Sequence, residues 1–348
     1  MTVEFLGTSF PLSADYGPEE VKIQKSICKQ VDTQWPTSKN LVISLTWFGP
    51  QFNNGLWEKL YDYKANNITF DNLFLVTTVD PPMINVTERR QIKNLVGALY
   101  VYELGNFDSP YQFNFFAPII GEKFTKYTDE ELIPTKIKHL FVNYNRKPKQ
   151  HRVDFVKKLT EQDLLKYGTV TLGKDESHLH DKDASNNIYL SIGEKHEDYL
   201  ALGNKPVVWG FGIPQDYYSL HRMDIWKTTF LYVNAATEFN PIDDLFCQQD
   251  VFKPLIGLRP FVINGVQKTY RWLRLNGFKT FNHYWNHIDI ENGNVHDTII
   301  ELIAYLKDLD EATILSMYDD MLPDLQYNKA RFFEYAQEQK YKIDNLFE

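Results

Sequence analysis

One stretch of the sequence places amide and arginine side chains directly after an apolar run. Residues 141–144 are followed by Asn145 and Arg146, and Arg152 comes after Pro148. A strand that ends here and turns into a helix would aim backbone N–H groups and the positive end of the helix dipole at the loop. Arg146 and Arg152 add bidentate donors suited to phosphate. The pattern predicts an anion site, and an ordinary basic loop is the alternative.

A second stretch, residues 245–281, contains Lys253. Its middle predicts a helix, a proline turn, a buried strand over residues 260–263 and a glycine loop. That order is typical of the carboxyl edge of a doubly wound sheet, where ligands bind. Lys253 near this edge would neutralise a diphosphate, and a lysine on a surface helix is the alternative.

Other common catalytic patterns are missing or incomplete in the sequence. It has no phosphate-binding G-x-x-x-x-G-K-[ST], no G-x-S-x-G elbow, and no H-E-x-x-H or paired C-x-x-C. Gly210 and Gly212 are followed by Ile213-Pro214, so the dinucleotide fingerprint lacks its third glycine. One acidic cluster would suit Mg²⁺ or Mn²⁺ against a diphosphate, with a solvated loop as the alternative: His178, His180, Asp181 and Asp183.

Short apolar runs alternate with amphipathic segments along the chain, which favours an α/β fold. Thr87 and Asp297 are the expected N-caps of two helices, and Leu99 is expected on the apolar face of the first. A domain boundary is expected near Pro134. The expected strands are 41–47, 73–79, 98–102, 137–144, 230–233 and 260–263, and two helical segments, 310–322 and 325–346, are expected to end the chain.

The charge of the chain is unevenly distributed. The formal net charge is −9, and residues 289–348 hold 14 acidic and 5 basic side chains. Residues 251–288 instead carry six basic side chains and no carboxylate. Because local fields steer ligands, this distribution supports an anionic ligand at the two stretches described above and leaves nucleic acid open as a partner.

Cysteine content and hydropathy predict where the protein works. Cys28 and Cys247 are the only cysteines in the sequence, so a disulfide framework is excluded and a reducing compartment is expected. The N-terminal residues show no signal peptide, and no run of 18 apolar residues occurs. We therefore expect a soluble, cytoplasmic protein without a membrane partner.

The two stretches resemble segments of phage-type glycosyltransferase-like proteins that are distantly similar to the α-1,3-fucosyltransferases. That group shows an N-R-x-P-R-x-H-R-like segment after a strand, which is similar to residues 145–152. It later shows a K-P-I-like segment, a P-F-I-x-x-G strand and L-R-x-x-G-F-K-T-F, which are similar to residues 252–281. The resemblance covers mainly residues 137–290.

This resemblance implies two Rossmann-like domains that face a cleft, the GT-B type, with a C-terminal helical tail. Residues 1–134 would bind the acceptor, residues 135–309 would bind a nucleotide-sugar donor, and residues 310–348 would pack back on the first domain. Arg146 and Lys253 would hold the donor diphosphate, with Asn145 and Arg152 beside them. The nucleotide-sugar would be a substrate, and neither a cofactor nor a divalent metal would be required.

The sequence departs from this family where Thr-Glu-Lys aligns with Gln248-Gln249-Asp250. Gln249 can still hydrogen-bond a hydroxyl of the donor, but it is neutral. Glu238 lies near the position of a family glutamate, although Thr237 and Ala236 align equally well. The departures indicate a different donor sugar, a different way of binding it, or loss of activity.

Inverting transfer needs a base to deprotonate the acceptor hydroxyl. Glu103, after the apolar run 99–102, is the first candidate, and Asp80, at the end of the 73–79 strand, is the second. A loop carboxylate without a catalytic role is the alternative for Glu103.

The leading hypothesis is a glycosyltransferase, with a hydroxymethylated pyrimidine in phage DNA, a glycan or a protein hydroxyl as the acceptor. A DNA acceptor would need a flipped base stacked on aromatic side chains, for which Tyr270, Trp272 and Trp285 are candidates; core packing is the alternative. A non-catalytic nucleotide-sugar-binding or structural protein is the second hypothesis. A nucleotidyl or phosphoryl transferase is disfavoured because the phosphate loop is missing.

Overall fold

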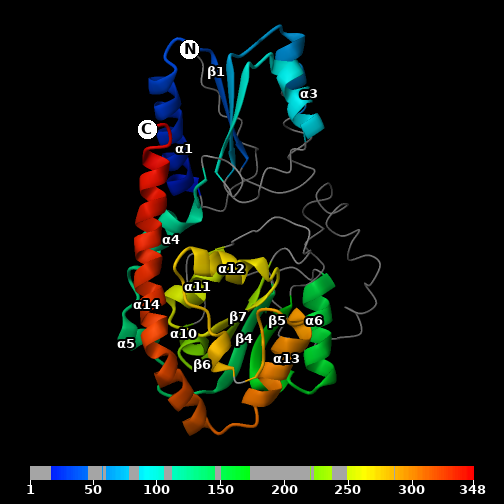
Figure 1. Cartoon of the computed structure of the whole chain (residues 1–348), viewed down its shortest axis with the longest axis vertical. Coiled ribbons are helices and arrows are strands. Elements are labelled where there is room, and N and C mark those ends of the chain that lie inside the picture. Colours follow the sequence, from blue (N-terminus) through cyan, green and yellow to red (C-terminus); the bar gives the residue numbers. More distant parts are fainter. Residues whose placement is uncertain are drawn as a thin grey trace. The chain divides into compact units, whose positions relative to one another are not determined.

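The protein is described by a computed structural model that covers residues 17–45, 57, 60–77, 86–105, 112–145, 150–172, 220, 223–236, 249–285 and 287–348. The chain forms two compact units, each with its own parallel sheet (Figure 1). Unit 1 comprises residues 1–119 and 336–348, and unit 2 comprises residues 120–335. The α/β class expected from the sequence is confirmed. The expected domain limits at residues 134 and 309 stay predictions.

The sheet of unit 1 has three parallel strands in the order β1-β2-β3. They are β1 (Asn40–Leu45), β2 (Asn72–Thr77) and β3 (Tyr100–Leu104). Helices α1 (Gly17–Gln34) and α3 (Val86–Val96) belong to the same unit. The three strands lie where the apolar runs of the sequence predict them.

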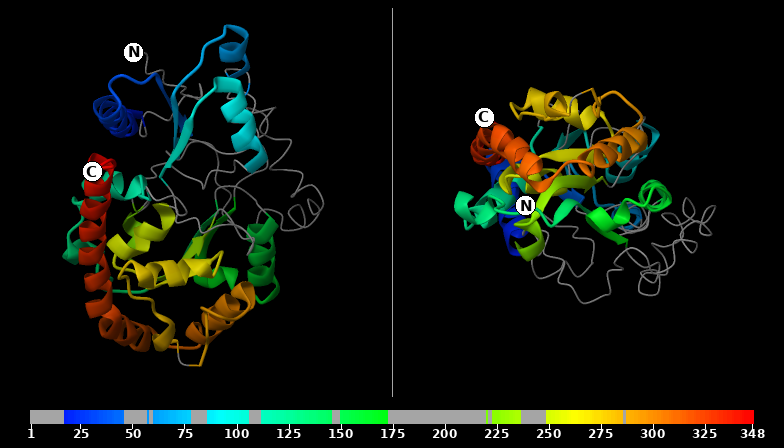
Figure 2. Two further views of the ribbon diagram at one scale, coloured as in Figure 1. Left: turned by 45° about the horizontal axis from the view of Figure 1, so that its top comes forward. Right: turned by 90° about the horizontal axis from the view of Figure 1, so that it is seen from below.

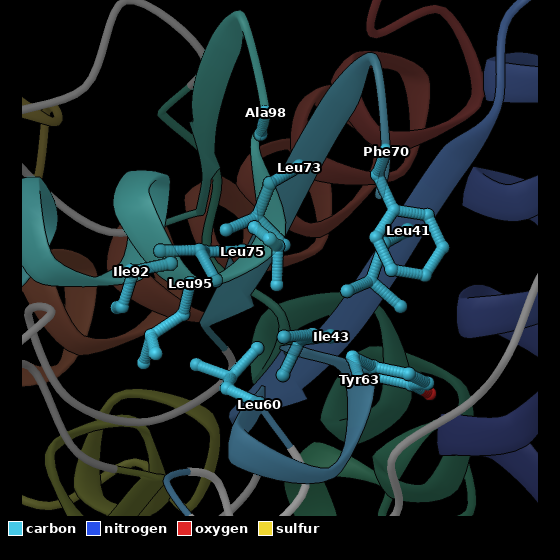
Figure 3. Packing of buried hydrophobic residues seen from close by; sticks show 11 residues of the cluster. Leu41, Ile43, Leu60, Tyr63, Phe70, Leu73, Leu75, Ile92, Leu95 and Ala98 are labelled. Atoms are coloured by element: carbon cyan, nitrogen blue, oxygen red, sulfur yellow. The ribbon is translucent and has the colours of Figure 1, made fainter. Parts of the chain in front are cut away.

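Side chains that alternate along these strands build a core on each face of the sheet. On one face the strands, α3 and a helix over residues 60–65 form a buried cluster (Figure 3). On the other face Phe74 stacks on Tyr102, with ring centroids 4.7 Å apart, and Trp35 and Phe347 pack against Phe74. The cluster comprises Leu41, Ile43, Leu60, Tyr63, Phe70, Leu73, Leu75, Ile92, Leu95, Val96 and Ala98.

The end of α3 corrects one detail of the sequence analysis. Leu99 was expected on the apolar face of this helix, but its side chain is 69% exposed. The helix ends at Val96, and Gly97 adopts a left-handed φ of 61° that favours glycine. The chain then turns into β3, so Leu99 no longer follows the helical periodicity.

The sheet of unit 2 has four parallel strands in the order β5-β4-β6-β7. They are β4 (His139–Asn145), β5 (Gly168–Leu172), β6 (Thr229–Ala235) and β7 (Phe261–Asn264). All seven residues of β6 are buried, as expected for a central strand covered on both faces. Sequence reasoning did not predict β5.

Helices cover this sheet on both faces. Helix α6 (Gln150–Glu161) lies against α13 (Val295–Leu306), where the Phe155 and His296 rings are 5.6 Å apart (Figures 1 and 2). Helix α10 (Met223–Trp226) packs on β6 through Trp226, whose ring lies 5.5 Å from Tyr232. Trp226 also donates to the carbonyl of Gly257, which directly follows α11 (Gln249–Ile256). Helix α12 (Lys268–Leu275) packs on α11 through Trp272 and Phe252. The short elements are α4 (Phe116–Phe124), α5 (Asp129–Leu132), η1 (Leu165–Tyr167) and η3 (Asn282–Tyr284).

Two expectations about the C-terminal helices need correction. The N-cap of α13 is Asn294, whose side chain accepts a hydrogen bond from the backbone N–H of Asp297, so Asp297 lies inside the first turn. The last helix, α14 (Glu311–Asp344), is continuous, whereas two segments were expected around Pro323. Proline removes one backbone donor and usually kinks or ends a helix. Here the side chains on both sides of it, including Tyr318 and Leu325, are buried and hold the helix together.

Candidate active site

The strand order of unit 2 creates a topological switch point between β4 and β6. From β4 the chain passes through α6 to β5 on one side, and from β6 it passes through α11 to β7 on the other. Right-handed crossovers place α6 and α11 on opposite faces of the sheet. The carboxyl ends of β4 and β6 therefore open between two helix N-termini, which is where ligands bind in sheets of this kind.

Three of the four strands have a buried asparagine as their last or last but one residue. Asn145 is the last residue of β4, Asn234 is the last but one of β6, and Asn264 is the last of β7. Their exposed fractions are 0%, 1% and 0%. Because the strands are parallel, these carboxamides lie at the same edge of the sheet.

A hydrogen-bond network fixes Asn145. Its Nδ2 donates to Oδ1 of Asn143 and to the carbonyl of Thr171, the latter at 2.9 Å. Nδ2 of Asn143 donates to the carbonyl of Val233 at 2.9 Å. The two asparagines therefore link β4 to the strands on both sides of it.

Other polar atoms at this edge have no partner. Oδ1 of Asn145 and both side-chain polar atoms of Asn234 and of Asn264 make no hydrogen bond in the described structure. A buried polar group without a partner costs about 1–3 kcal/mol. Such groups are rare in folded proteins. A ligand that forms hydrogen bonds with them would explain why they are retained here.

Arg152, in the first turn of α6, is held at the end of β6. Its Nη2 donates to the carbonyls of Ala235 and Ala236, at 2.9 and 3.0 Å. The ring of His151 also hydrogen-bonds the Ala236 carbonyl, at 2.9 Å. These contacts bring the N-terminus of α6 to the switch point and place a buried guanidinium there. The predicted contact of Arg152 with a diphosphate stays a prediction.

Lys253 lies one turn into α11, and only 2% of its side chain is exposed. Its Nζ lies 3.0 Å from Oδ1 of Asp250, so the ammonium already has a counterion. Burial raises the pKa of Tyr232 on β6 well above its usual value, and the charge of Asp250 raises it further. The charge of Asp250 therefore acts on Tyr232, whose side chain lies on the face of β6 opposite the Ala235 side chain.

Several predicted site residues fall outside the described part of the chain. They are Asp80, Arg146, Glu238 and the cluster of His178, His180, Asp181 and Asp183. Gln249 is the first residue of α11, and only its backbone is described.

The aromatic residues predicted to stack on an acceptor are buried in unit 2. Trp285 is fully buried. Tyr270 is 2% exposed, and its hydroxyl accepts a hydrogen bond from the backbone N–H of Ile263 at 2.7 Å. Trp272 packs against Phe278 and Tyr335. In this structure all three rings belong to the core, and their proposed contact with an acceptor stays a prediction.

Glu103, the candidate base, lies in unit 1. It is the last but one residue of β3 and pairs in register with Leu75 of β2. Its side chain is partly buried. The position at the carboxyl end of a parallel strand agrees with the expected one, and the catalytic role stays a prediction.

Sequence reasoning missed Asn143, Asn234 and Asn264. The available signal was a polar residue at the end of an apolar run, in residues 230–235 and in residues 261–264. An amide side chain at such a position can be recognised as a candidate binding group only when the parallel register of the strands is known.

Among the described residues, no three His, Cys, Asp or Glu side chains come together in a way that would hold a metal ion. Burial, with a smaller contribution from Asp32, raises the pKa of the Cys28 thiol to about 12. No helix in the described ranges has the length and apolar character needed to cross a membrane.

Comparisons with known proteins show a distant likeness to solved structures. No protein-family model matches the chain, and no curated protein matches its sequence. Among solved structures it is similar to α,α-trehalose 6-phosphate synthase from Burkholderia multivorans, with a TM-score of 0.33 and 8% identity over 92% of this chain and 74% of the other. At this score and identity the likeness assigns neither a family nor an activity to the chain.

Proposed function

We propose that the protein is a glycosyltransferase whose unit 2 binds a nucleotide-sugar donor at the switch point between β4 and β6. The observation that carries the proposal is the presence of two buried cations in the helices that begin there. Arg152 lies in the first turn of α6, and Lys253 lies one turn into α11. Their charges and the positive ends of the two helix dipoles favour an anionic ligand at this edge.

The sequence motifs support the same site. Residues 145–152 span the end of β4 and the start of α6, and residues 252–281 span α11, β7 and α12. The two segments that resemble glycosyltransferase-like proteins are far apart in the sequence. Both include the carboxyl end of a strand in one parallel sheet, so both contribute to one edge.

Sugar transfer from such a donor breaks the bond between the sugar and the diphosphate. Negative charge then develops on the leaving nucleoside diphosphate, and fixed cations stabilise it. In this proposal Arg152 and Lys253 supply that stabilisation together with Arg146, which follows β4 in the sequence. The proposal assigns no step to a metal ion.

Glu103 is the proposed base that removes the proton from the acceptor hydroxyl. A glutamine at this position cannot accept that proton but keeps nearly the same shape. We therefore expect Glu103→Gln to abolish transfer and to leave donor binding unchanged. Glu122→Gln, which changes an exposed carboxyl group, is the matched control. Turnover of Glu103→Gln at the wild-type rate would exclude Glu103 as the base.

In this proposal the acceptor is a hydroxyl group of DNA, of a glycan or of a protein. The three rings predicted to stack on a flipped base are buried in unit 2, which does not favour a DNA acceptor. A hydroxymethylated pyrimidine in DNA is therefore tested as one arm among several. Glycans and protein hydroxyl groups form the other arms.

A donor-binding protein without catalysis is the second candidate. The ion pair between Lys253 and Asp250 favours it, because the carboxylate offsets the positive charge that would stabilise the leaving nucleoside diphosphate during transfer. The replacement of a family glutamate by the neutral Gln249 points in the same direction.

One experiment separates the two candidates. The protein is incubated with a panel of nucleotide sugars, each with hydroxymethylated DNA, oligosaccharides or a peptide mixture, and the products are analysed by mass. A thermal-shift screen of the same donors runs in parallel. Sugar transfer supports the enzyme. Stabilisation by a donor without transfer or hydrolysis supports the binding protein, and no stabilisation by any donor excludes both.

A further inference from the structure

Asn145, Ala235 and Asn264 form a row across three neighbouring strands of unit 2. Ala235 pairs with Asn264 in the register of β6 and β7. Phe141 pairs with Leu231 in the register of β4 and β6, and the same register four residues further on brings Asn145 opposite Ala235. Residues that pair in a parallel sheet point to the same face. The two carboxamides therefore flank Ala235 on one face of the sheet.

The dimensions of this row suit the binding of one ring of a small ligand. Neighbouring strands lie about 4.8 Å apart, so the backbones of Asn145 and Asn264 are about 10 Å apart. Between them Ala235 contributes only a methyl group. The exposed fractions of the three side chains are 0%, 5% and 0%, so water does not solvate the amides freely.

The unsatisfied atoms define the chemistry of a matching ligand. Oδ1 of Asn145 and Oδ1 of Asn264 are acceptors without a partner, and Nδ2 of Asn264 is a donor without one. Two acceptor oxygens repel phosphate and carboxylate groups. Hydroxyl groups fit, because each hydroxyl both donates and accepts a hydrogen bond.

We propose that Asn145 and Asn264 bind the vicinal hydroxyl groups of a sugar ring in the donor. The inference rests on the proposed function, because the donor supplies that ring. Arg152, whose Nη2 donates to the carbonyl of Ala235 in this row, binds the diphosphate, and the asparagine row binds the neutral part next to it. Both the ribose and the transferred sugar of a nucleotide-sugar carry vicinal hydroxyl groups.

The test uses the variant Asn264→Leu, which has nearly the same shape but no polar side-chain atoms. Without a ligand, it is expected to unfold at a higher temperature than the wild type, because it removes a buried group that has no partner. It is expected to bind the nucleotide-sugar at least about tenfold more weakly. This change in affinity corresponds to the loss of about one to two hydrogen bonds. Asn264→Ala removes the same amide without adding bulk and is expected to weaken binding equally.

Two comparisons identify the source of the hydroxyl groups. If the row binds the ribose, the wild type prefers ribonucleoside diphosphates to their 2′-deoxy forms and Asn264→Leu loses this preference. If the row binds the transferred sugar, the wild type prefers the nucleotide-sugar to the nucleoside diphosphate and the variant loses that preference. Either result supports the inference.

Asn143→Leu is the matched control for the stability measurement. Asn143 is as buried as Asn264, but its amide is hydrogen-bonded on both sides, so this variant is expected to unfold at a lower temperature. A lowered unfolding temperature of Asn264→Leu would overturn the inference. The inference would also be overturned if Asn264→Leu kept both the preference for ribonucleoside diphosphates and the preference for the nucleotide-sugar.

Failure of the proposed function gives a different result. If no nucleotide or nucleotide-sugar binds the wild type, the proposed function is wrong. The asparagine row is then tested with nucleosides and free monosaccharides at millimolar concentration, which carry the same hydroxyl groups without phosphate. Binding that is lost in Asn264→Leu sustains the inference, and the absence of binding overturns it.

Discussion

Nζ of Lys253 lies 3.0 Å from Oδ1 of Asp250, one turn earlier in α11. Only 2% of the lysine side chain is exposed, against 34% of the aspartate side chain. The pair lies at the start of the helix that follows β6, where the proposed diphosphate binds. A carboxylate in this position neutralises the ammonium and lowers the attraction for an anion.

The first prediction follows from this ion pair. Asp250→Asn removes the negative charge and leaves Lys253 to the ligand. We expect the affinity for a nucleoside diphosphate to rise about 3- to 10-fold, about 0.7–1.4 kcal/mol. Isothermal titration at two salt concentrations measures the change. Asp324→Asn, which breaks the pair with Lys279 elsewhere in unit 2, is the control. Equal affinities of Asp250→Asn and the wild type would exclude a diphosphate beside Lys253.

The second prediction concerns the asparagine network of β4. Asn143 donates to the carbonyl of Val233 on β6 and accepts from Nδ2 of Asn145. Asn143→Leu leaves that carbonyl without this buried donor. We expect the free energy of unfolding to fall by about 1–3 kcal/mol. Urea denaturation measures it, and Asn292→Leu, at an exposed position, is the control. An unchanged free energy would show that the network does not stabilise the sheet.

The third prediction concerns Arg259, which is fully buried between the rings of Trp226 and Tyr318, 5.7 Å from each centroid. Burial lowers the pKa of its guanidinium to about 10, so it stays charged at neutral pH. It donates to the carbonyls of Trp226 and Leu258. The Tyr318 hydroxyl donates to the carbonyl of Leu258 at 2.9 Å and so ties α14 to the same loop.

Tyr318→Phe removes this hydroxyl and keeps the ring beside Arg259. We expect a loss of about 1–2 kcal/mol in the free energy of unfolding. The same change at Tyr284, which lies at the surface of unit 2 and contacts Asp324, is expected to cost less than about 0.5 kcal/mol. The two variants are compared by urea denaturation at pH 7. Equal losses would contradict the role of Tyr318.

The sequence predicts the central strands well because their signal is local. Residues 73–79 and 230–233 are apolar runs, and both form strands. The five-residue β5 was missed because its residues, Gly168–Leu172, include a glycine and two threonines and give no apolar run. Helix α14 was divided at Pro323 because propensity alone does not register buried side chains on both sides of a proline.

The charge pattern shows the same limit. The basic stretch 251–288 indicates an anion site when it is counted as charge alone. In the structure Arg259 is in the core, Arg274 pairs with Glu291, and Lys279 pairs with Asp324. Part of the basic stretch is therefore neutralised by the acidic residues that follow it in the sequence. Composition cannot tell which cations have such partners, because the pairs form only when the chain folds.

The last prediction concerns the pH dependence of stability. His296 of α13 packs on Phe155 of α6 and is 8% exposed. Burial lowers the pKa of its imidazole, and the charge of Lys158 lowers it further, against smaller opposing effects of Asp154 and Asp297. The unfolded chain therefore takes up the proton first as the pH falls. The stability contributed by the neutral ring is complete above about pH 6.5 and is lost as the pH falls toward the folded pKa.

His296→Phe keeps an aromatic ring against Phe155 and removes the titration. We expect the free energy of unfolding of the wild type to fall between pH 7 and pH 5, and that of the variant to fall less. Urea denaturation at intervals of half a pH unit measures both. His283→Phe is the control, because the His283 side chain is 64% exposed, and it should keep the wild-type slope. If His296→Phe keeps that slope as well, the protons are taken up at other groups and His296 does not control the loss of stability.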